Sequence, residues 1–404
     1  MIAPEKALRL ILKNARPLAP QTVPLADSAG RVLAEDLRAS QDLPPFDNSA
    51  MDGFAVRAKD CLAAAERAPV TLGIVETVRA GSLARAKLKR GEAVKIMTGA
   101  PLPAGADAVV QKEAADGKTA GQVRLFSPPA AGDYVRRRGS DIRAGRLLLR
   151  KGARIRSYEV SLLAAQGRAR VSVLKRPIVS ILTTGDELVE TAANLAPGKI
   201  RDSNGPALTA ALARWGIAAL SQGIVQDDPA TLKTALKRSL RECDVLLVSG
   251  GVSVGDFDYT KTILQGLGLK EIFWKVAIKP GKPLLFGLCG EKLVFGLPGN
   301  PISALVCLEE FVRPALEKLQ GLSPFRPAYP LIGKAINGLL KPKERRQYLF
   351  CQAKRKADGY HLEIILPQGS AMLSMAGRAN ALALSPVGTS QVKKGDTLSF
   401  RWLK

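Results

Sequence analysis

The spacing of apolar residues changes along the chain, and each stretch predicts a different kind of structure. Residues 1–43 have the spacing of helices, and Pro4 suits the first position of one of them. Three apolar residues lie on one face of that helix, namely Leu8, Ile11 and Leu12. From residue 44 to about 140 the apolar runs are short and separated by Gly and Pro, which predicts a small β domain. Residues 141–175 contain one more helix candidate and one more strand.

Strands and helices alternate from Pro177 onward. The runs 178–182 and 245–248 are continuously apolar, as strands buried on both faces are. Alternation of this kind indicates βαβ units and a mainly parallel sheet, and such sheets bind ligands at the carboxyl ends of their strands. In chain order we expect strands at 178–182, 219–225, 245–248, 272–278 and 293–296, and helices at 204–215, 230–241, 259–266 and 302–319.

The end of the chain has a third pattern. After the Pro-rich segment 323–327, apolar and polar positions alternate as they do in antiparallel strands, and Asp358-Gly359 is a hairpin signal. This pattern predicts a small β-barrel, with a sandwich as the alternative. The only histidine, His361, lies in this stretch, and we interpret it as an ordinary strand residue.

Length and composition narrow the class of protein. A chain of 404 residues, 46% of them apolar, can form several folded domains. Its longest apolar runs fall short of the ~20 residues that a membrane span needs. Its first residues carry charge where a signal peptide would be apolar. We therefore expect a cytoplasmic protein that makes no use of a membrane.

The charge balance and the reactive side chains narrow the chemistry. The chain has 60 Lys and Arg against 36 Asp and Glu, a formal net charge of +24. This charge favours anionic partners, which include nucleic acid, anionic lipid and small anionic substrates. The five cysteines are far apart and form no CxxC pair, which argues against a zinc site and a disulfide framework. A single histidine excludes a multi-histidine metal site.

The loops that follow the strands of the α/β part carry the candidate chemistry. They contain paired acids at 183–187 and 255–258, bare glycines at 249–253, two lysines at 279–283 and a helix start at 298–301. Glycine turns and helix starts offer backbone N–H groups to phosphate, and Mg²⁺ takes carboxylate and phosphate oxygens. Because the loops share one end of the sheet, they predict a pocket for a phosphorylated ligand beside a divalent cation.

The motifs, taken in order, resemble those of the molybdopterin molybdenumtransferase family, known as MoeA and represented in animals by the C-terminal part of gephyrin. The resemblance covers essentially the whole chain. The matching stretches are PPFDNSAMDGFAV at 44–56, MTGAPLP at 97–103, RRRGSDI at 136–142, TGDEL at 184–188, DSN at 202–204, DDP at 227–229, SGGVSVGDFDYTK at 249–261, WKVAIKPGKP at 274–283, GLPGNP at 296–301 and QGS at 368–370.

The resemblance implies a multidomain α/β plus β protein. Its four domains would be a discontinuous helical and linker domain, a β domain, a molybdopterin-binding α/β domain and a C-terminal β-barrel. They would span residues 1–43 with 141–175, 44–140, 176–322 and 323–404, respectively. The resemblance also implies a homodimer in which the α/β domain of one subunit and the β domain of the other share a cleft.

The implied reaction belongs to molybdenum cofactor biosynthesis. Molybdate is inserted into adenylylated molybdopterin, AMP is released, and Mg²⁺ is the cofactor. Transient contacts with the molybdopterin adenylyltransferase and with molybdoenzyme acceptors or chaperones follow from this activity. Specific binding of nucleic acid does not.

The resemblance also implies roles for individual residues. Glu187 and Asp258 would be catalytic acids and metal ligands. Three further catalytic residues would come from the other subunit, namely Asp52, Thr98 and Asp141. Three lysines would bind molybdate and phosphate, namely Lys275, Lys279 and Lys282. The loop of Ser249, Gly250 and Gly251 would bind the pterin or its phosphate through backbone N–H groups.

The remaining candidates lie on the substrate side of the site. Pro298 and Pro301 would fix a loop, and Asn300 would cap the helix behind it. Asp227 is a substrate-binding candidate, although either Asp227 or Asp228 could instead cap the helix after Pro229. Ser370 is a candidate whose role the sequence does not define.

Three other functions compete with this interpretation. A scaffold with the same fold, such as gephyrin, would carry a fused adenylylating domain and a long linker, which this sequence lacks. A nucleic-acid binder would carry an aromatic-rich basic strand or a helix-turn-helix pattern, but only 5% of the residues are aromatic. The adenylylation step itself would require ATP, whereas insertion requires molybdate.

Overall fold

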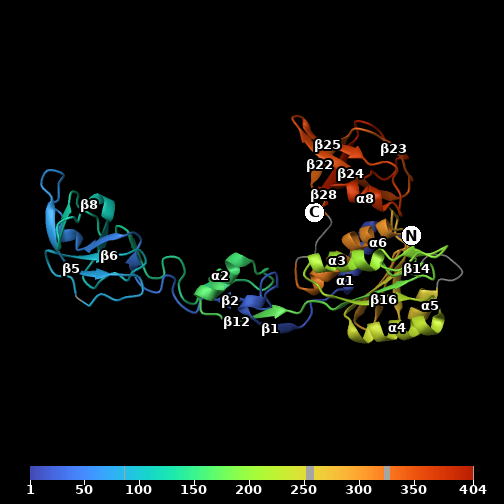
Figure 1. Ribbon diagram of the computed structural model, residues 1–404, viewed down its shortest axis with the longest axis horizontal. Helices are drawn as coiled ribbons and strands as arrows, with labels where there is room; N and C mark the ends of the chain where they lie inside the picture. The colour runs from blue at the N-terminus through green and yellow to red at the C-terminus, as the bar shows by residue number, and fades with distance from the viewer. Residues whose placement is uncertain (86, 252–258, 323–327, 404) are drawn as a thin grey trace. The chain divides into compact units, whose positions relative to one another are not determined.

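The longest apolar runs of the chain build one six-stranded sheet. A computed structural model of the protein describes residues 1–85, 87–251, 259–322 and 328–403 (Figure 1). The sheet has the order β16-β13-β17-β21-β20-β18, in which the first four strands are parallel and the last two continue antiparallel. The prediction of a mainly parallel sheet is confirmed. The strands are β13 (Val179–Thr184), β16 (Ala219–Val225), β17 (Val245–Ser249), β18 (Lys270–Trp274), β20 (Leu285–Cys289) and β21 (Lys292–Leu297).

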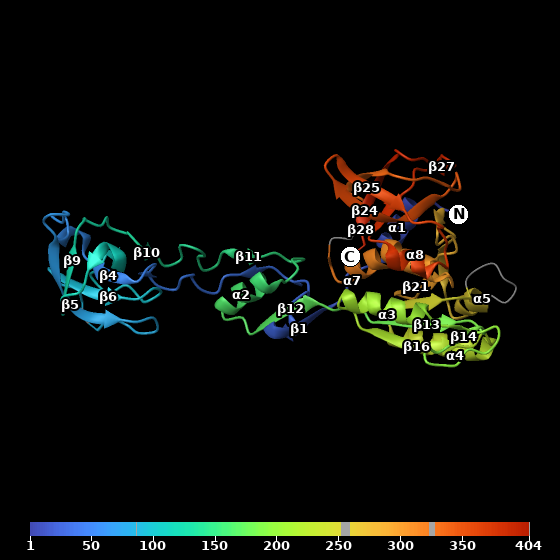
Figure 2. The same cartoon turned by 45° about the horizontal axis from the view of Figure 1, so that its top comes forward.

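Helices cover both faces of this sheet because successive strand residues point in opposite directions. In β17, Leu246 and Val248 pack with α4 and α5, whereas Val245 and Leu247 pack in the larger core with α3 and α6. Figures 1 and 2 show α4 on one side of the sheet and α3 on the other. The helices are α3 (Asn204–Arg214), α4 (Pro229–Glu242), α5 (Tyr259–Gly266) and α6 (Pro301–Cys307).

The chain divides into two compact units. One comprises Met1–Ala34, Gly152–Val160 and Arg170–Lys404, and the other comprises Glu35–Lys151 and Ser161–Ala169. The predicted four-domain division stays a prediction.

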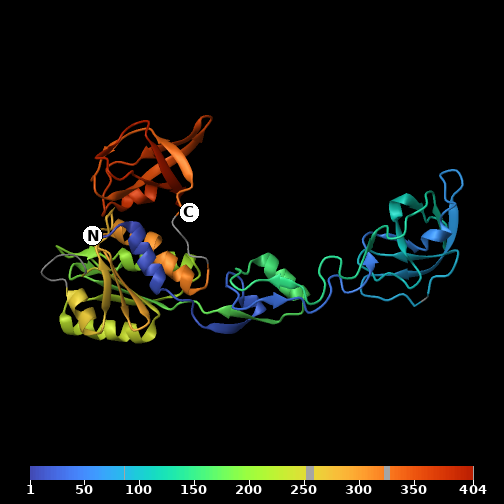
Figure 3. The ribbon, with the colours of Figure 1, turned by 180° about the vertical axis from the view of Figure 1, so that it is seen from behind.

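The prediction that residues 1–43 are helical is wrong beyond the first helix. Helix α1 (Pro4–Asn14) has Pro4 in its first turn and buries Ala7 and Ile11, and it packs beside α7 (Arg313–Leu319) (Figure 3). The chain then becomes extended in β1 (Pro20–Pro24), which pairs with β12 (Arg170–Leu174). Prolines lack the N–H that a helix needs, so the proline-rich stretch after Asn14 ends the helix.

The helix predicted over 302–319 is interrupted. The chain forms α6, then one π-helical stretch (Leu308–Val312), then α7. Pro314, in the first turn of α7, cannot donate to the carbonyl four residues earlier, and its ring clashes with that carbonyl. The wider π turn accommodates this missing hydrogen bond.

The strand predicted over 272–278 is also interrupted. Strand β18 ends at Trp274, because the next residue, Lys275, has a positive φ of 73°. A short strand, β19 (Ile278–Lys279), then pairs with β24 of the C-terminal barrel instead. Strand β20 lies in the sheet between β21 and β18 and was not predicted.

The C-terminal residues close into a barrel, as predicted. Five strands pair in the order β24-β25-β22-β28-β26, and β26 pairs back onto β24. Asp358-Gly359 forms the turn between β24 and β25, and His361 lies in β25. The five strands are β22 (Leu331–Ala335), β24 (Arg346–Lys356), β25 (Gly359–Ile364), β26 (Ala381–Leu384) and β28 (Thr397–Trp402).

The second unit is built on another six-stranded sheet, which confirms the predicted β domain. Its order is β7-β4-β6-β5-β9-β8. Two separate apolar clusters cover its two faces, one around Phe54 and Leu125 and the other around Val94 and Ile96. The strands are β4 (Gly53–Val56), β5 (Val70–Val78), β6 (Glu92–Ile96), β7 (Ala108–Gln111), β8 (Ala115–Asp116) and β9 (Gln122–Leu125).

The five cysteines are free and buried. Burial raises the pKa of the Cys61 thiol to about 11 and that of Cys351 to about 12, so neither is a thiolate near neutral pH. Within the described ranges, no helix is long and apolar enough to cross a membrane.

Candidate active site

Three neighbouring parallel strands end at one edge of the large sheet. Strands β13, β17 and β21 pair in register, with Thr183 opposite Ser249 and Ser249 opposite Leu297. The loops that begin at Gly185, Gly250 and Pro298 therefore leave the sheet side by side. The prediction that the chemistry-bearing loops share one edge of the sheet is confirmed for these three.

A buried network of hydrogen bonds connects these loops. The Asn204 side-chain amide donates to Ser249 Oγ (2.8 Å) and to the Gly299 carbonyl (2.7 Å). The Asp202 carboxylate accepts from the Asn204 backbone N–H (2.9 Å) and from the Thr183 hydroxyl (2.9 Å). Satisfied polar groups in a buried setting fix one arrangement of the chain. The DSN motif at 202–204, for which the sequence indicated no role, therefore connects the loops through hydrogen bonds.

The glycines of the Ser249 loop are required by close backbone contacts. Gly250 and Gly251 have positive φ angles of 97° and 60°. A Cβ at Gly250 would lie 2.1 Å from the Thr184 carbonyl oxygen, which no side chain can do. The Gly250 N–H donates to the Leu297 carbonyl (3.2 Å), so that donor is used within the fold.

The two neighbouring aspartates after β16 have different roles. Asp228 caps α4, where its carboxylate accepts the Thr231 N–H at 2.8 Å. This hydrogen bond lowers the pKa of Asp228. Asp227 instead accepts the hydroxyl of Thr184, at the end of β13. The alternative left open by the sequence is thereby resolved, because Asp228 is the cap and Asp227 belongs to the loop edge.

The acids expected to hold a metal are described only in part. Glu187 is exposed in the loop after β13, and its carbonyl accepts the Ile200 N–H at 2.8 Å. Asp258 lies outside the described residues. In the ranges that the structure describes, no three His, Cys, Asp or Glu side chains gather as a metal site. The Glu187 carboxylate is nevertheless a hard oxygen donor of the kind that fits Mg²⁺.

The loop that carries the three candidate lysines, residues 275–282 and called the lysine loop below, is bonded to the rest of the fold at its first residue. Lys275 has a φ of 73°, in the left-handed region. Its N–H donates to the Leu284 carbonyl (3.0 Å), and its carbonyl accepts from the Ile2 N–H (3.1 Å). Val276 donates in turn to the Lys282 carbonyl (2.9 Å). These bonds bring the two ends of the loop together.

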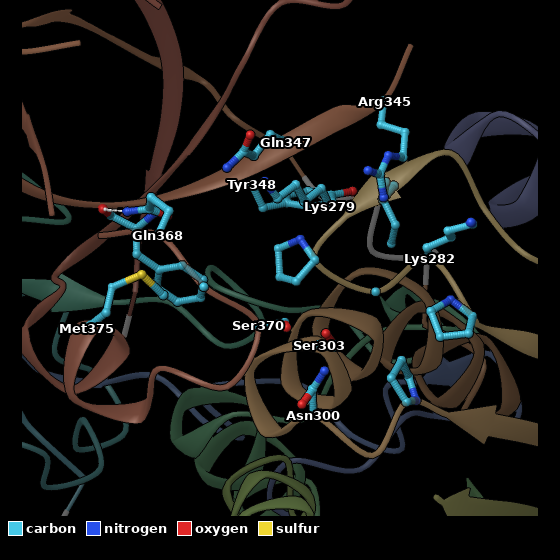
Figure 4. A pocket seen from close by; sticks show the side chains of 17 residues that line it. Lys279, Lys282, Asn300, Ser303, Arg345, Gln347, Tyr348, Gln368, Ser370 and Met375 are labelled. Carbon is cyan, nitrogen blue, oxygen red and sulfur yellow. Dashed lines mark hydrogen bonds between the residues drawn. The ribbon is translucent and has the colours of Figure 1, made fainter. Parts of the chain in front are cut away.

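A pocket of about 230 Å³ lies where this loop meets the barrel (Figure 4). Figure 4 shows Asn300, Ser303 and Ser370 on one side of it and Gln347 and Tyr348, from β24, on the other. The carbonyl of Ser370 accepts the Ile302 N–H at 3.1 Å, so a barrel loop completes the start of α6. The Asn300 side chain makes no capping bond and lines the pocket instead, contrary to its expected role as a side-chain cap.

The charges around this pocket have one sign. Its lining includes three cations, Lys279, Lys282 and Arg345, and none of the described lining residues is acidic. No ion pair joins these three side chains to a carboxylate in the described part of the chain. Two serines, Ser303 and Ser370, add hydroxyl donors. A small oxyanion is the ligand that such a lining suits, because it accepts hydrogen bonds and carries the missing charge.

Several residues of this pocket were not predicted from the sequence, among them Ser303, Arg345 and Gln347. Ser303 follows the GLPGNP motif by two positions, Arg345 directly precedes β24, and Gln347 lies in β24. Gln347 is 2% exposed, and its Oε1 has no hydrogen-bond partner. A buried amide oxygen without a donor is rare in a folded protein, so this position calls for a partner beyond the described residues. The only signal in the sequence was the run of basic residues before β24.

The second unit brings two of its predicted site residues together. The Asp52 carboxylate accepts both the backbone N–H and the hydroxyl of Thr98, each at 2.7 Å. These hydrogen bonds lower the pKa of Asp52, so it is a carboxylate at neutral pH. Asp141 lies in a separate turn, where its N–H donates to the Leu43 carbonyl (3.0 Å). No hydrogen bond or ion pair joins it to Asp52 or Thr98 among the described residues.

The arginine run of the second unit includes two structural residues. Arg137 pairs with Asp47 (2.8 Å), and Arg138 pairs with Asp42 (2.6 Å). Their charges are therefore matched within the unit.

The comparisons with known proteins agree along the whole chain. The family profile described as "MoeA N-terminal region (domain I and II)" matches residues 2–167. The profile "Probable molybdopterin binding domain" matches 180–318, and "MoeA C-terminal region (domain IV)" matches 334–401.

Individual relatives match over nearly their full length. A molybdopterin molybdenumtransferase of Staphylococcus epidermidis is 33% identical over 401 residues, which cover 98% of this chain and 94% of that protein. Molybdopterin molybdenumtransferase 2 of Mycobacterium tuberculosis is 38% identical over 346 residues, covering 84% and 85%. The crystal structure of the molybdopterin biosynthesis MoeA protein from Pyrococcus horikosii superposes with a TM-score of 0.83 at 33% identity, covering 100% and 99%.

The fold and the loop edge thus define a multidomain protein whose central α/β domain is of the molybdopterin-binding type. The chain belongs to the MoeA family of molybdopterin molybdenumtransferases. It is an enzyme of molybdenum cofactor biosynthesis.

The left-handed backbone at Lys275 makes a testable difference to stability. A side chain with a Cβ is disfavoured there, whereas glycine is not. We expect the Lys275→Gly protein to be more stable than the Lys275→Ala protein by about 0.5–1 kcal/mol. Both variants remove the ammonium group. The difference between their free energies of unfolding in urea therefore reports the cost of the left-handed backbone alone. Equal stabilities, or a more stable alanine variant, would contradict a strained Lys275.

Proposed function

We propose that this enzyme inserts molybdate into adenylylated molybdopterin and releases AMP. The pocket between the lysine loop and the barrel carries this proposal, because it offers three cations and two hydroxyls to an oxyanion. Both substrates are anions, so bringing them together is opposed by charge repulsion. Cations that have no carboxylate partner reduce this repulsion where the substrates meet.

Molybdate is the small oxyanion that the pocket would hold. Lys279, Lys282 and Arg345 would neutralise its charge, and Ser303 and Ser370 would donate to its oxygens. The unpartnered Oε1 of Gln347 is an acceptor, so it would face a donor of the ligand and not an oxygen of molybdate. The barrel contributes Arg345, Gln347 and Ser370 to this site, so it is part of the catalytic machinery.

The loop edge of the sheet would hold the adenylylated pterin. The Ser249–Gly251 loop leaves the sheet at this edge, and Asp227 lies beside it through its bond to Thr184. Pro298 and Pro301 fix the neighbouring loop, which the buried Asn204 network holds in place. The sulfurs of the dithiolene would then face the molybdate pocket.

Glu187 and Asp258 are the residues that would hold Mg²⁺. When bound, the ion polarises the phosphoanhydride and stabilises the AMP that leaves. Water attacks the phosphoanhydride, which frees AMP and leaves a phosphate on the pterin. The dithiol binds molybdenum through both sulfurs, and its two protons leave with one molybdate oxygen as water.

The second unit would complete the site across a homodimer. Asp52 and Thr98 form one preorganised pair in this unit, and Asp141 lies in the same unit. In the proposed dimer these residues would face the loop edge of the partner subunit. Transient contacts with the adenylyltransferase that supplies the substrate, and with the protein that receives the cofactor, belong to the same proposal.

The proposed activity predicts release of AMP that depends on molybdate. Purified protein with adenylylated molybdopterin and Mg²⁺ should release AMP faster when molybdate is present, with no requirement for ATP. Arg345→Met should raise the KM for molybdate about 10- to 100-fold, because a charged hydrogen bond is lost. Glu187→Ala should lower AMP release about 100-fold or more, since a ligand of the proposed Mg²⁺ is removed.

A matched control lies next in the sequence. Arg346 pairs with Glu5 at 2.5 Å and does not line the pocket. Arg346→Met should leave the KM for molybdate close to that of the unchanged protein. If both arginine variants raised the KM equally, the pocket would not be the molybdate site. If AMP release did not respond to molybdate, the proposed insertion reaction would be wrong.

The shared site predicts complementation between inactive subunits. Asp52→Ala and Glu187→Ala chains should each be inactive alone. Mixed after unfolding and refolding, they should recover about a quarter of the activity, because half the dimers are mixed and each mixed dimer has one intact site. No recovery, with mixed dimers verified by mass spectrometry, would place both residues in the same subunit's site.

A further inference from the structure

The side chains of Trp274 and Lys275 lie on the same side of the chain, which an extended strand would not allow. Successive residues of a strand point to opposite faces. Strand β18 ends at Trp274, and the φ of 73° at Lys275 reverses that direction. The Lys275 ammonium consequently lies 3.8 Å from the centroid of the Trp274 ring. This distance is well within the range of a cation–π interaction.

The fold enforces this arrangement from both sides of Lys275. The N–H of Lys275 is bonded to Leu284 and its carbonyl to Ile2, so both of its backbone groups are used. A left-handed residue other than glycine persists only where its surroundings impose it, and such residues gather at functional sites. The observed backbone conformation is thus coupled to the position of one ammonium group.

A second lysine contacts the same indole but has a different charge environment. The Lys261 ammonium, on α5, lies 4.1 Å from the ring centroid. It also forms an ion pair with Glu271 at 2.8 Å. Lys275 has no such carboxylate partner among the described residues. Both lysines contact Trp274, but only the charge of Lys275 is available to a ligand.

Topology places this pair at the ligand edge of the sheet. Strand β18 is antiparallel to β20, and β20 is antiparallel to β21, so β18 runs in the direction of β21. Its carboxyl end, at Trp274, lies at the edge where the site loops leave the sheet. Lys275 does not line the molybdate pocket. The Lys275 ammonium would therefore bind an anionic group that lies outside that pocket.

We propose that Trp274 is a positioning residue that holds the Lys275 ammonium for the phosphoanhydride of the pterin substrate. The identity of this anionic group rests on the proposed function, whereas the contact between Trp274 and Lys275 does not. The indole keeps the cation at one place without neutralising it, which a carboxylate could not do. The Lys261–Glu271 pair holds the ring from α5 and β18.

The first experiment tests the contact in the free protein. Reductive methylation with ¹³C-formaldehyde labels lysine nitrogens and keeps their charge, and a Lys275→Arg variant identifies the Lys275 signal. The ring current of Trp274 should move the Lys275 methyl resonances upfield of those of the exposed Lys282. In a Trp274→Leu protein they should return to the position of Lys282. Lys275 resonances at the ordinary position in the unchanged protein would overturn the proposal.

The second experiment tests the consequence for the substrate. Cation–π attraction decreases from Trp to Tyr and Phe and is absent in Leu, so the KM for adenylylated molybdopterin should rise in that order. We expect Trp274→Leu to raise it about two- to fivefold. In a Lys275→Met background the same change should have no further effect, because the partner is gone. A purely structural role would give the same loss in both backgrounds and would overturn the positioning role.

The controls separate this inference from the proposed function. Trp402 lies in the barrel against Tyr360 and Phe400, so Trp402→Phe should leave both the Lys275 signal and the KM unchanged. If no AMP release is found, the same series is measured as binding of pyrophosphate by calorimetry. Upfield Lys275 signals without AMP release would reject the proposed function and keep the contact. Normal AMP release with additive effects of the two substitutions would reject only the inference.

Discussion

The candidate site depends on cations that the fold holds without neutralising them. Some arginines elsewhere in the chain are paired with carboxylates, as Arg313 is with Glu309 (3.2 Å) and Glu317 (3.1 Å). Lys279, Lys282 and Arg345 lack such partners among the described residues, although like charges repel each other at close range. Backbone bonds of the lysine loop and packing of the barrel keep these cations together. A bound oxyanion offsets the repulsion among these cations, so their arrangement favours binding of an oxyanion.

The two halves of the pocket are held together by a buried cluster around Glu310. Glu310, on the π-helical turn, is 3% exposed and accepts from Arg401 of β28 (3.1 Å) and from the Tyr329 hydroxyl (2.8 Å). Burial raises the pKa of the Glu310 carboxyl, while Arg401 and Tyr329 favour its charged form. Removing one member of such a buried pair leaves an uncompensated charge, which is strongly destabilising. The barrel is thereby anchored to the α/β layer, where it contributes half of the pocket.

Local patterns gave the sequence-based analysis its strongest results. Continuous apolar runs predicted β13 and β17, because strands buried on both faces are apolar at every position. Alternating apolar and polar residues predicted the barrel strands, because these are buried on one face only. Local exceptions defeated the same approach. Pro314 divided a helix, and the left-handed Lys275 ended a strand, and neither effect follows from periodicity. Ser303, Arg345 and Gln347 were missed because they meet only when the barrel folds onto the α/β layer, whereas Lys279 and Lys282 share a short motif that can be recognised in the sequence.

We propose above that the pocket between the lysine loop and the barrel is the molybdate site. Anomalous diffraction from crystals soaked in molybdate, recorded above and below the molybdenum absorption edge, locates the metal directly. We expect one strong molybdenum peak enclosed by Lys279, Arg345, Ser303 and Ser370, and loss of that peak in Arg345→Met crystals. A molybdenum peak beside Glu187, with the pocket empty, would show that the oxyanion binds without these cations and would refute the proposed site.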